Sequence, residues 1–330
     1  MVSFRSFLTA SFVLASATAV FASPIARSSD LSARDTTEEL GKRQGGCTTR
    51  LQRRAWHTLS DAEKKSYIDA ELCLMWRIPQ QTGLEASVSR FDDLVKAHQL
   101  QSMLVHGDGW FLPFHRLHMH AHERLLREEC GYNGAQPYWD EEADAGAFSS
   151  SAIFSPTNGF GGNGVGENNC IQTGPFANYT LHTGPSYDNT DHCISRQIDD
   201  DASRGSSTEN VNACLAEQKF ATAWPCIEGS PHSGGHNGVG GEMGNAISSP
   251  GDPLFYLHHT YLDRVWWRWQ QQSLPARLTD FSGYTTQDRP AGGWIDATLD
   301  DELNMFGVIA NARIRDVMDV TGDLLCMEYV

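Results

Sequence analysis

Apolar side chains recur at helical spacing in several separate parts of this 330-residue chain. The pattern predicts helices over residues 60–77, 87–104 and 114–130, and again over 210–219 and 253–272. Ser60 and Glu63 have the spacing of a capping box, which marks the start of the first helix. Pro225 is expected to break the helical pattern before the last segment. The sequence therefore predicts a mainly helical fold.

Residues 143–208 differ in composition, because Gly, Asn, Ser and Asp replace the apolar periodicity there. We expect long loops with at most short strands in this region, and Cys170 and Cys193 are placed to tie the loops down. The end of the chain mixes turns with short apolar runs such as 305–310. With no internal repeat in view, one mainly helical domain with long loops is the simplest account.

The first 43 residues differ from the rest of the chain. Residues 1–22 end in an apolar run before small residues, which fits a cleaved secretory signal peptide. Residues 23–43 are rich in Ser, Arg and Thr and end in the dibasic pair Lys42-Arg43, as a propeptide does. A leader that is never cut stays the alternative. We expect residues 44–330 to form the folded domain of a secreted protein.

Composition and charge narrow the function classes. Hydrophobic residues make up 40% of the chain and charged residues 20%, which is typical of a globular protein. The formal net charge of −16 argues against nucleic acid and against an anionic membrane as partners. Eight cysteines in a secretory context predict up to four disulfides, whose pairing stays open. Asn178 lies in the one glycosylation sequon.

The thirteen histidines are the strongest chemical signal in the sequence. Seven of them stand in three short groups: His98, His106 and His115, then His232 and His236, then the adjacent His258 and His259. Imidazole in this quantity suits copper, zinc, iron or nickel. The grouping favours a metal centre over unrelated structural histidines.

Two local patterns place the later histidines on helices. Ser230 and Pro231 suit the start of a short helix, so His232 and His236 would project from one face about a turn apart. Gly238 would end this helix.

Asp252 and Pro253 are an equally good start for the next helix. That helix would present Phe255, His259 and Asp263 on one face at four-residue steps. Asp263 is then placed to orient an imidazole or to pair with a neighbouring cation.

These segments resemble the two copper-binding signatures of tyrosinases, catechol oxidases and molluscan hemocyanins, the type 3 copper proteins. The resemblance rests on H-x8-H-R preceded by Phe-Leu-Pro-Phe, on H-x3-H and on D-P-L-F-x-x-H-H-x-x-x-D-R, and it spans about residues 98–269. It implies a four-helix bundle around two copper ions, CuA and CuB, each held by three histidines. It also implies O2 as co-substrate and phenolic small molecules as substrates, oxidised to o-quinones.

Carried over position by position, the resemblance assigns CuA to His98, His106 and His115, and CuB to His232, His236 and His259. His57 is the only other candidate for the first CuA ligand. His259 is preferred to His258 because the family ligand lies seven residues after the aspartate of D-P. His258 would then pack beside the site.

The resemblance implies further roles near the metals. Glu228 matches a family glutamate that holds a water used to deprotonate monophenols. Ser233 stands where many tyrosinases carry an asparagine that helps to hold this water, and Asn237 follows His236 instead. Because serine is shorter, we expect oxidation of o-diphenols and leave hydroxylation of monophenols open.

Ala246 matches the residue that gates the CuB side in relatives, and it is small. Together with Gly240, Gly241 and Gly244 it predicts an open entrance for bulky phenols or a peptidyl tyrosine. The chain ends at Val330, so we expect a short fungal-type enzyme without the C-terminal lid domain of larger relatives.

Three further histidines follow in the predicted helix over 114–130: His118, His120 and His122. They would form either an accessory metal site or simply a polar face. Glu123 is expected to orient or neutralise a group in the bundle, and Phe255 matches an aromatic residue that stacks beside a copper ligand.

The sequence therefore predicts a secreted polyphenol oxidase that converts o-diphenols or o-aminophenols to o-quinones. A tailoring oxidase of a secondary-metabolite pathway, acting on a phenolic or peptidyl-tyrosine intermediate, would use the same motifs. A hemocyanin-like O2 carrier shares the ligands but is built as a giant repeated array. The natural substrate and the oligomeric state stay open.

Overall fold

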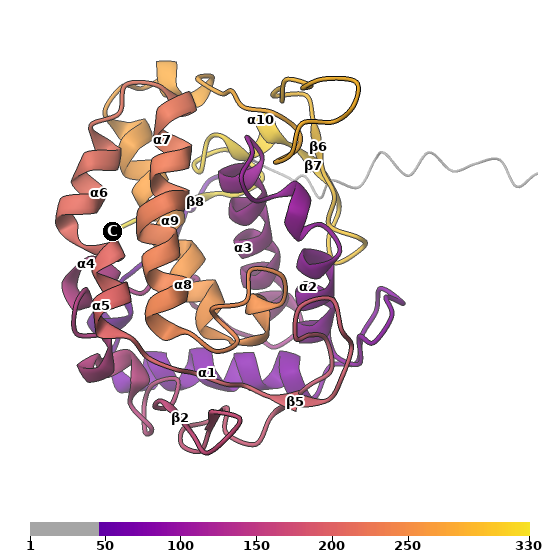
Figure 1. Cartoon of the computed structure of the whole chain (residues 1–330), viewed down its shortest axis with the longest axis vertical. Coiled ribbons are helices and arrows are strands. Elements are labelled where there is room, and N and C mark those ends of the chain that lie inside the picture. The colour runs from indigo at the N-terminus through magenta and orange to yellow at the C-terminus, as the bar shows by residue number, and fades with distance from the viewer. Residues whose placement is uncertain (1–45) are drawn as a thin grey trace, which may run out of the picture. The chain divides into compact units, whose positions relative to one another are not determined.

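The structure is a computed structural model that describes residues 46–330. The expected signal peptide and propeptide lie outside these residues. Helices dominate, which confirms the predicted class, and Figure 1 shows α3 and α9 running in roughly the same direction with α1 lying across them. The helices are α1 (Asp61–Trp76), α2 (Arg90–Gln99), α3 (Phe111–Glu128), α4 (Glu141–Asp144), α5 (Asp200–Ser203), α6 (Thr208–Leu215), α7 (Phe220–Ile227), α8 (Ser233–Val239), α9 (Leu254–Gln271) and α10 (Ile314–Val317).

Capping residues decide where the first long helices begin. Ser60 and Glu63 form the predicted capping box at the start of α1. Ser89 and Asp92 form a second box, so α2 begins at Arg90, later than predicted. Each box pairs backbone N–H groups that have no partner within the helix.

The helix α3 begins at Phe111, three residues before the predicted start. Pro113 lies in its first turn, where backbone N–H groups have no acceptor within the helix, so proline is tolerated there. The prediction also carried α2 too far, because α2 ends at Gln99 and a separate 3-10 turn, Ser102–Leu104, follows it.

The expected break at Pro225 is wrong. Pro225 lies inside α7, a helix that the sequence pattern missed. Phe220 and Ile227 bury its apolar face, and the disulfide Cys214–Cys226 ties α7 to α6. Tertiary packing therefore outweighs the local cost of a proline.

The separate helix expected to start at Ser230 is also wrong. A π-helical turn, Glu228–His232, joins α7 directly to α8, and the N–H of Ser233 reaches back to the carbonyl of Glu228. Pro231 has no backbone N–H group, so it leaves no donor without an acceptor in this widened turn. The helix continues past Gly238 and ends at Val239.

Two glycines that were expected to open the entrance have a different role. Gly240 and Gly241 have positive φ and turn the chain out of α8. A Cβ atom on Gly240 would lie 2.6 Å from the carbonyl O of Gln197, and one on Gly241 would lie 2.2 Å from that of Ser195. Both glycines are therefore needed for close packing, whereas Gly244 is exposed.

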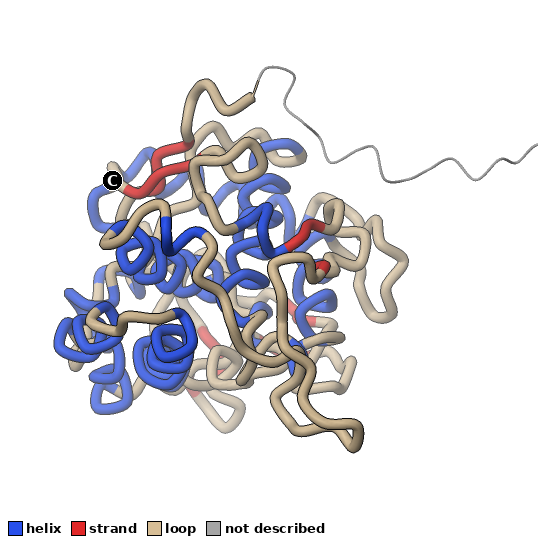
Figure 2. Tube along the Cα trace, turned by 90° about the horizontal axis from the view of Figure 1, so that it is seen from above, coloured by secondary structure: helices blue, strands red, loops and turns tan. Residues whose placement is uncertain are grey.

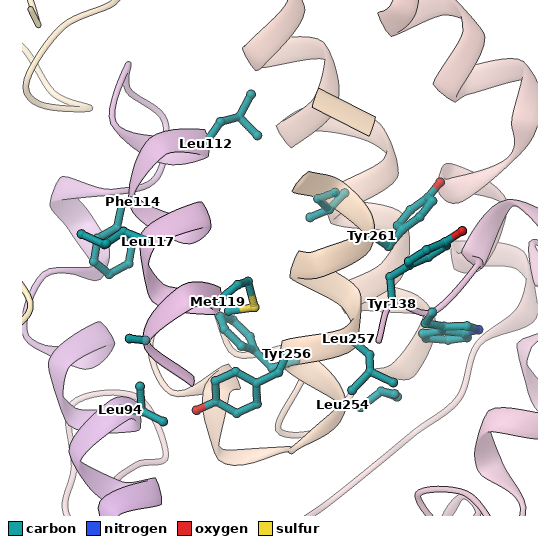
Figure 3. Packing of buried hydrophobic residues seen from close by; sticks show 14 of the residues in the cluster. Leu94, Leu112, Phe114, Leu117, Met119, Tyr138, Leu254, Tyr256, Leu257 and Tyr261 are labelled. Carbon is teal, nitrogen blue, oxygen red and sulfur yellow. The ribbon is translucent and has the colours of Figure 1, made fainter. Parts of the chain in front are cut away.

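The core lies between α2, α3 and α9. Figure 3 shows Met119 and Tyr256 between α3 and α9, and Phe114 and Leu117 on the side of α3 that faces Leu94 of α2. All five side chains are buried. Each contributes about 1.5–3 kcal/mol when removed from water, so this packing holds in place the helices that carry the histidines.

Strands are few and short, as Figure 2 shows, and the chain between α4 and α5 is mainly loop, as predicted. Within residues 46–330 they form four two-stranded pairs: β1 (Leu51–Arg53) parallel to β8 (Met327–Tyr329), and antiparallel β2 (Gly164–Val165) with β3 (Cys170–Ile171), β4 (Thr180–Leu181) with β5 (His192–Cys193), and β6 (Glu302–Leu303) with β7 (Ala312–Arg313).

All eight cysteines pair, as the count predicted. The disulfides are Cys47–Cys326, Cys73–Cys130, Cys170–Cys193 and Cys214–Cys226. The third of them ties down the long loop region. No helix within residues 46–330 has the length and apolar character needed to cross a membrane.

Candidate metal centre

The helices bring the predicted ligands together in two adjacent groups. Within residues 46–330, side-chain nitrogens that lie within 4.8 Å of one another belong to His98, His106 and His115 in the first group, and to His232, His236, His258 and His259 in the second. The first group comes from α2, α3 and the connection between them. The second comes from the π-helical turn, α8 and α9.

Backbone carbonyls orient five of the six predicted ligands. In each, Nδ1 lies close to one carbonyl oxygen: His98 to Ile247 (3.0 Å), His106 to Ser102 (2.8 Å), His115 to Phe111 (2.8 Å), His232 to Glu228 (3.2 Å) and His236 to Met243 (2.6 Å). A carbonyl only accepts, so Nδ1 carries the proton and Nε2 keeps a free lone pair. This is the second contact that metal-binding histidines usually make.

The free nitrogens fit a metal ion. The Nε2 atoms of His98, His115 and His232 are buried without any hydrogen-bond partner. A buried polar atom left unpaired costs about 1–3 kcal/mol. Nε2 of His236 lies 3.2 Å from Nε2 of His259, so the two rings point to the same place. A set of neutral imidazoles of this kind suits copper.

Burial keeps these imidazoles neutral. Loss of hydration lowers the pKa of five of them well below the usual 6.5, and repulsion from neighbouring imidazoles lowers it further. The five are His98, His115, His232, His236 and His259. Burial also lowers the pKa of His106 to about 4. A neutral imidazole is the form that binds a metal.

His258 and His259 differ in their surroundings. His259 stacks on His115 of the first group, with ring centroids 4.1 Å apart and planes 10° apart. His258 places Nδ1 2.6 Å from the carboxylate of Glu141. A Cβ atom on Gly235 would lie 2.3 Å from the His258 ring, so glycine makes room for it against α8. His259 therefore faces the other group, while His258 is held against a carboxylate.

Phe255 packs against a ring of each group. Its ring centroid lies 4.2 Å from that of His259 and 5.4 Å from that of His98. The ring is fully buried, so it forms an apolar wall common to both pockets.

Glu228 lies beside the first group. Its Oε1 accepts a 2.7 Å hydrogen bond from the N–H of Gly107, and burial raises its pKa to about 7. The Ser233 hydroxyl donates to the backbone carbonyl of Glu228 at 3.1 Å, so it is not hydrogen-bonded to the carboxylate. The hydroxyl proton of Ser233 is therefore used in a hydrogen bond to the backbone and not to the Glu228 carboxylate.

Sequence reasoning missed Asp108, which is 1% exposed. Its Oδ1 accepts from the N–H of Trp110, while its Oδ2 is buried without a partner. Burial raises its pKa to about 8, and the nearby Glu228 adds to this shift. Its position two residues after His106 was the only signal in the sequence.

The two remaining predicted site residues lie at the surface. Asn237 is exposed on α8 and has no hydrogen bond to Glu228. Ala246 is exposed in the connection between α8 and α9, next to Ile247, whose carbonyl holds His98. The small side chain of Ala246 is therefore next in sequence to the residue whose carbonyl orients His98.

Other histidines do not join these groups. His57 is exposed outside them. His118 places Nε2 3.2 Å from the carbonyl of Leu94. His122 lies between Gln136 and Glu71. Within residues 46–330, no metal-binding group includes His118, His120 or His122, so the polar face is the better interpretation.

The two predicted carboxylates of the bundle pair with buried arginines. Glu123 accepts a 2.8 Å hydrogen bond from Arg53. Asp263 pairs with Arg116 and accepts from the Tyr329 hydroxyl of β8. These buried pairs connect α3 and α9 to the paired strands β1 and β8.

Comparison with known proteins gives a consistent result. The common central domain of tyrosinase matches residues 88–272. The chain is 34% identical over 298 residues to "Tyrosinase ustQ" from Aspergillus flavus, covering 86% of this chain and 80% of that protein. It is 28% identical over 340 residues to "N-acetyl-6-hydroxytryptophan oxidase ivoB" from Emericella nidulans, covering 84% and 91%. A solved polyphenol oxidase from Thermothelomyces thermophila superposes with a TM-score of 0.79 at 29% identity, covering 85% and 89%.

Proposed function

The chain belongs to the tyrosinase family and is an oxidoreductase of the tyrosinase and polyphenol oxidase type. We propose that it uses two copper ions and O2 to oxidise o-diphenols to o-quinones, or o-aminophenols to the corresponding o-quinone imines. The observation that carries the proposal is the pair of adjacent histidine groups, in which Nε2 of His98, His115 and His232 is buried without a hydrogen-bond partner. Two diphenols give up four electrons and four protons to one O2, which leaves two quinones and two waters.

Three histidines would hold each copper ion. They are His98, His106 and His115 for CuA, and His232, His236 and His259 for CuB. Bound copper would bind O2 and accept electrons from the phenolic substrate. The protein contributes fixed imidazoles, because five of the rings are anchored at Nδ1 and cannot turn away freely. Phe255 contributes a buried apolar ring next to His98 and His259.

Glu228 is our candidate for taking a proton from a monophenol. A phenol with a pKa near 10 is a poor metal ligand until it loses its proton, and a carboxylate with bound water is a suitable acceptor. The N–H of Gly107 holds this carboxylate in place. Ser233 gives it no direct support, which favours diphenol oxidation over monophenol hydroxylation.

Replacing Ser233 with asparagine tests this point. The longer amide reaches further than the hydroxyl and offers both a donor and an acceptor. We expect Ser233→Asn to raise the ratio of monophenol to diphenol oxidation several-fold, and Ser233→Ala to leave that ratio low. Rates of O2 uptake on both substrates give the ratio. An unchanged ratio in Ser233→Asn would mean that Ser233 does not limit the hydroxylation of monophenols.

A second candidate function is oxidation of a larger phenolic intermediate in a secondary-metabolite pathway. The relative named N-acetyl-6-hydroxytryptophan oxidase acts, by its name, on an acylated hydroxyl-bearing amino acid. Because Ala246 is small and exposed, it would leave room for an acylated amino acid of this kind, or for a peptidyl tyrosine, to reach the metal site. Ala246→Phe should then slow a bulky phenol much more than it slows catechol.

We also propose that the protein is secreted. The supporting observation is that all eight cysteines are disulfide-bonded, a state typical of oxidising compartments and rare in the cytosol. Detection of the protein in culture medium, with a new N-terminus near residue 44, is the expected result.

O2 uptake by the copper-loaded protein on 4-tert-butylcatechol and 4-tert-butylphenol tests the main proposal. We expect prompt uptake with the catechol and slow or absent uptake with the phenol. Prompt uptake with both would make the protein a full tyrosinase, with Glu228 working without the usual asparagine. A chain that binds two coppers but is silent with both would contradict diphenol oxidation and favour the second candidate.

A further inference from the structure

One short segment orients an imidazole in each pocket. The carbonyl of Met243 holds His236 of the second group at 2.6 Å, and the carbonyl of Ile247 holds His98 of the first group at 3.0 Å. The segment between these two carbonyls belongs to the connection from α8 to α9, which runs toward α2 in Figure 1. Its backbone therefore sets the positions of two rings that come from different helices.

A buried carboxylate closes this segment. Glu242, just before it, is 3% exposed. Its Oε1 accepts a 2.7 Å hydrogen bond from the hydroxyl of Ser248, just after the segment. The side chains of Glu242 and Ser248 thus clamp the five residues 243–247 from both ends.

Other contacts hold the same carboxylate and the same turn. Nε2 of His192, on β5, lies 3.3 Å from Oε2 of Glu242. The N–H of Glu242 donates to the carbonyl of Ser195 at 2.9 Å. Inside the segment, the amide oxygen of Asn245 accepts from the N–H groups of Ile247 and Ser248. The clamp is therefore anchored to the loop region next to the bundle.

We propose that Glu242 is a positioning residue for both metal pockets. It contacts none of the predicted ligands directly and acts through the backbone carbonyls of Met243 and Ile247. A metal site tolerates only about 0.5 Å of displacement, so a loosened segment weakens both pockets together. The inference rests on the proposed copper site, since copper is the metal used to test it.

Copper binding to three variants of the full protein tests the role. We expect Glu242→Ala to lower the affinity for copper at both pockets by about 10-fold or more, the usual range for a partner behind a ligand. Glu242→Gln keeps an oxygen acceptor for Ser248 and should restore most of the affinity. Ser248→Ala removes the hydrogen bond to Glu242 and the one that the hydroxyl accepts from the N–H of Ser186, and it should give a smaller loss in the same direction because Glu242 keeps its contact with His192. Chelator competition and copper per chain are the measurements, and catalytic activity is not needed.

A matched control separates positioning from general loss of stability. Leu325→Ala empties a buried apolar position before β8 and should lower Tm without lowering copper affinity. Wild-type affinity in Glu242→Ala, or a loss confined to one pocket, would overturn the proposal. Should Glu242→Ala fail to fold, wild-type affinity in Ser248→Ala would overturn it as well. If the wild-type chain itself binds no copper, the proposed function fails instead.

Discussion

Replacing His259 with alanine is expected to leave about one copper ion per chain and to reduce o-diphenol oxidation more than 100-fold, beyond the roughly 10–100-fold range for changes behind a ligand. Nε2 of His259 converges with Nε2 of His236, and its ring stacks on His115 of the other group. It is therefore the member of the adjacent pair that faces both pockets. Copper per chain by metal analysis, with O2 uptake on a catechol, gives the result.

The neighbouring residue supplies the matched control. His258→Ala should keep two copper ions, because the ring of His259, not that of His258, stacks on His115 of the first group. It should still lower stability by about 1–3 kcal/mol, since the buried Glu141 carboxyl loses a partner. Loss of copper in His258→Ala and its retention in His259→Ala would reverse the assignment.

The parts of the fold that sequence reasoning anticipated depend on local signals. The capping box of Ser60 and Glu63 and the helical periodicity gave α1, α3 and α9 to within a few residues. The mainly loop character of the chain between α4 and α5 followed from its Gly and Asn content. The histidine groups followed from spacing combined with the family resemblance, and the structure brings all six predicted ligands together.

The missed features depend on contacts between distant parts of the chain. Pro225 predicts a break, but buried neighbours and a disulfide keep α7 helical. The carbonyl of Ile247 lies far along the sequence from His98, so nothing local indicates that it orients that ring. The same holds for Asp108, whose burial beside Glu228 appears only once the helices are packed.

The buried histidines also make the metal-free protein sensitive to acid. Besides the six predicted ligands, burial lowers the pKa of His118 and of His258 to about 3 each. Eight imidazoles thus stay neutral in the folded chain at pH values where the unfolded chain, with a pKa near 6.5, takes up protons. Four buried carboxyl groups have raised pKa values and oppose this effect: Asp92, Asp108, Glu141 and Glu228.

We therefore expect the free energy of unfolding of the copper-free chain to fall steeply as pH drops below 6.5. A histidine with a lowered folded pKa makes the unfolded state the stronger proton binder, so stability rises with pH and is lost on acidification. One imidazole that titrates fully contributes up to about 1.4 kcal/mol per pH unit, so the slope is set by the excess of these imidazoles over the opposing carboxyl groups. A domain with about 5–15 kcal/mol of stability should then lose much of it in mild acid.

Urea unfolding of the copper-free chain at pH 7.5, 6.5 and 5.5 measures this slope. The variant His118→Leu removes one buried imidazole that is outside both metal groups, so its slope should be smaller by about 1.4 kcal/mol per pH unit. Copper should move the transition to lower pH, because metal and protons compete for the same Nε2 atoms. A free energy of unfolding that stays constant from pH 7.5 to 5.5 would mean that the imidazoles are hydrated and protonated in the copper-free protein. The two pockets would then form only when copper binds.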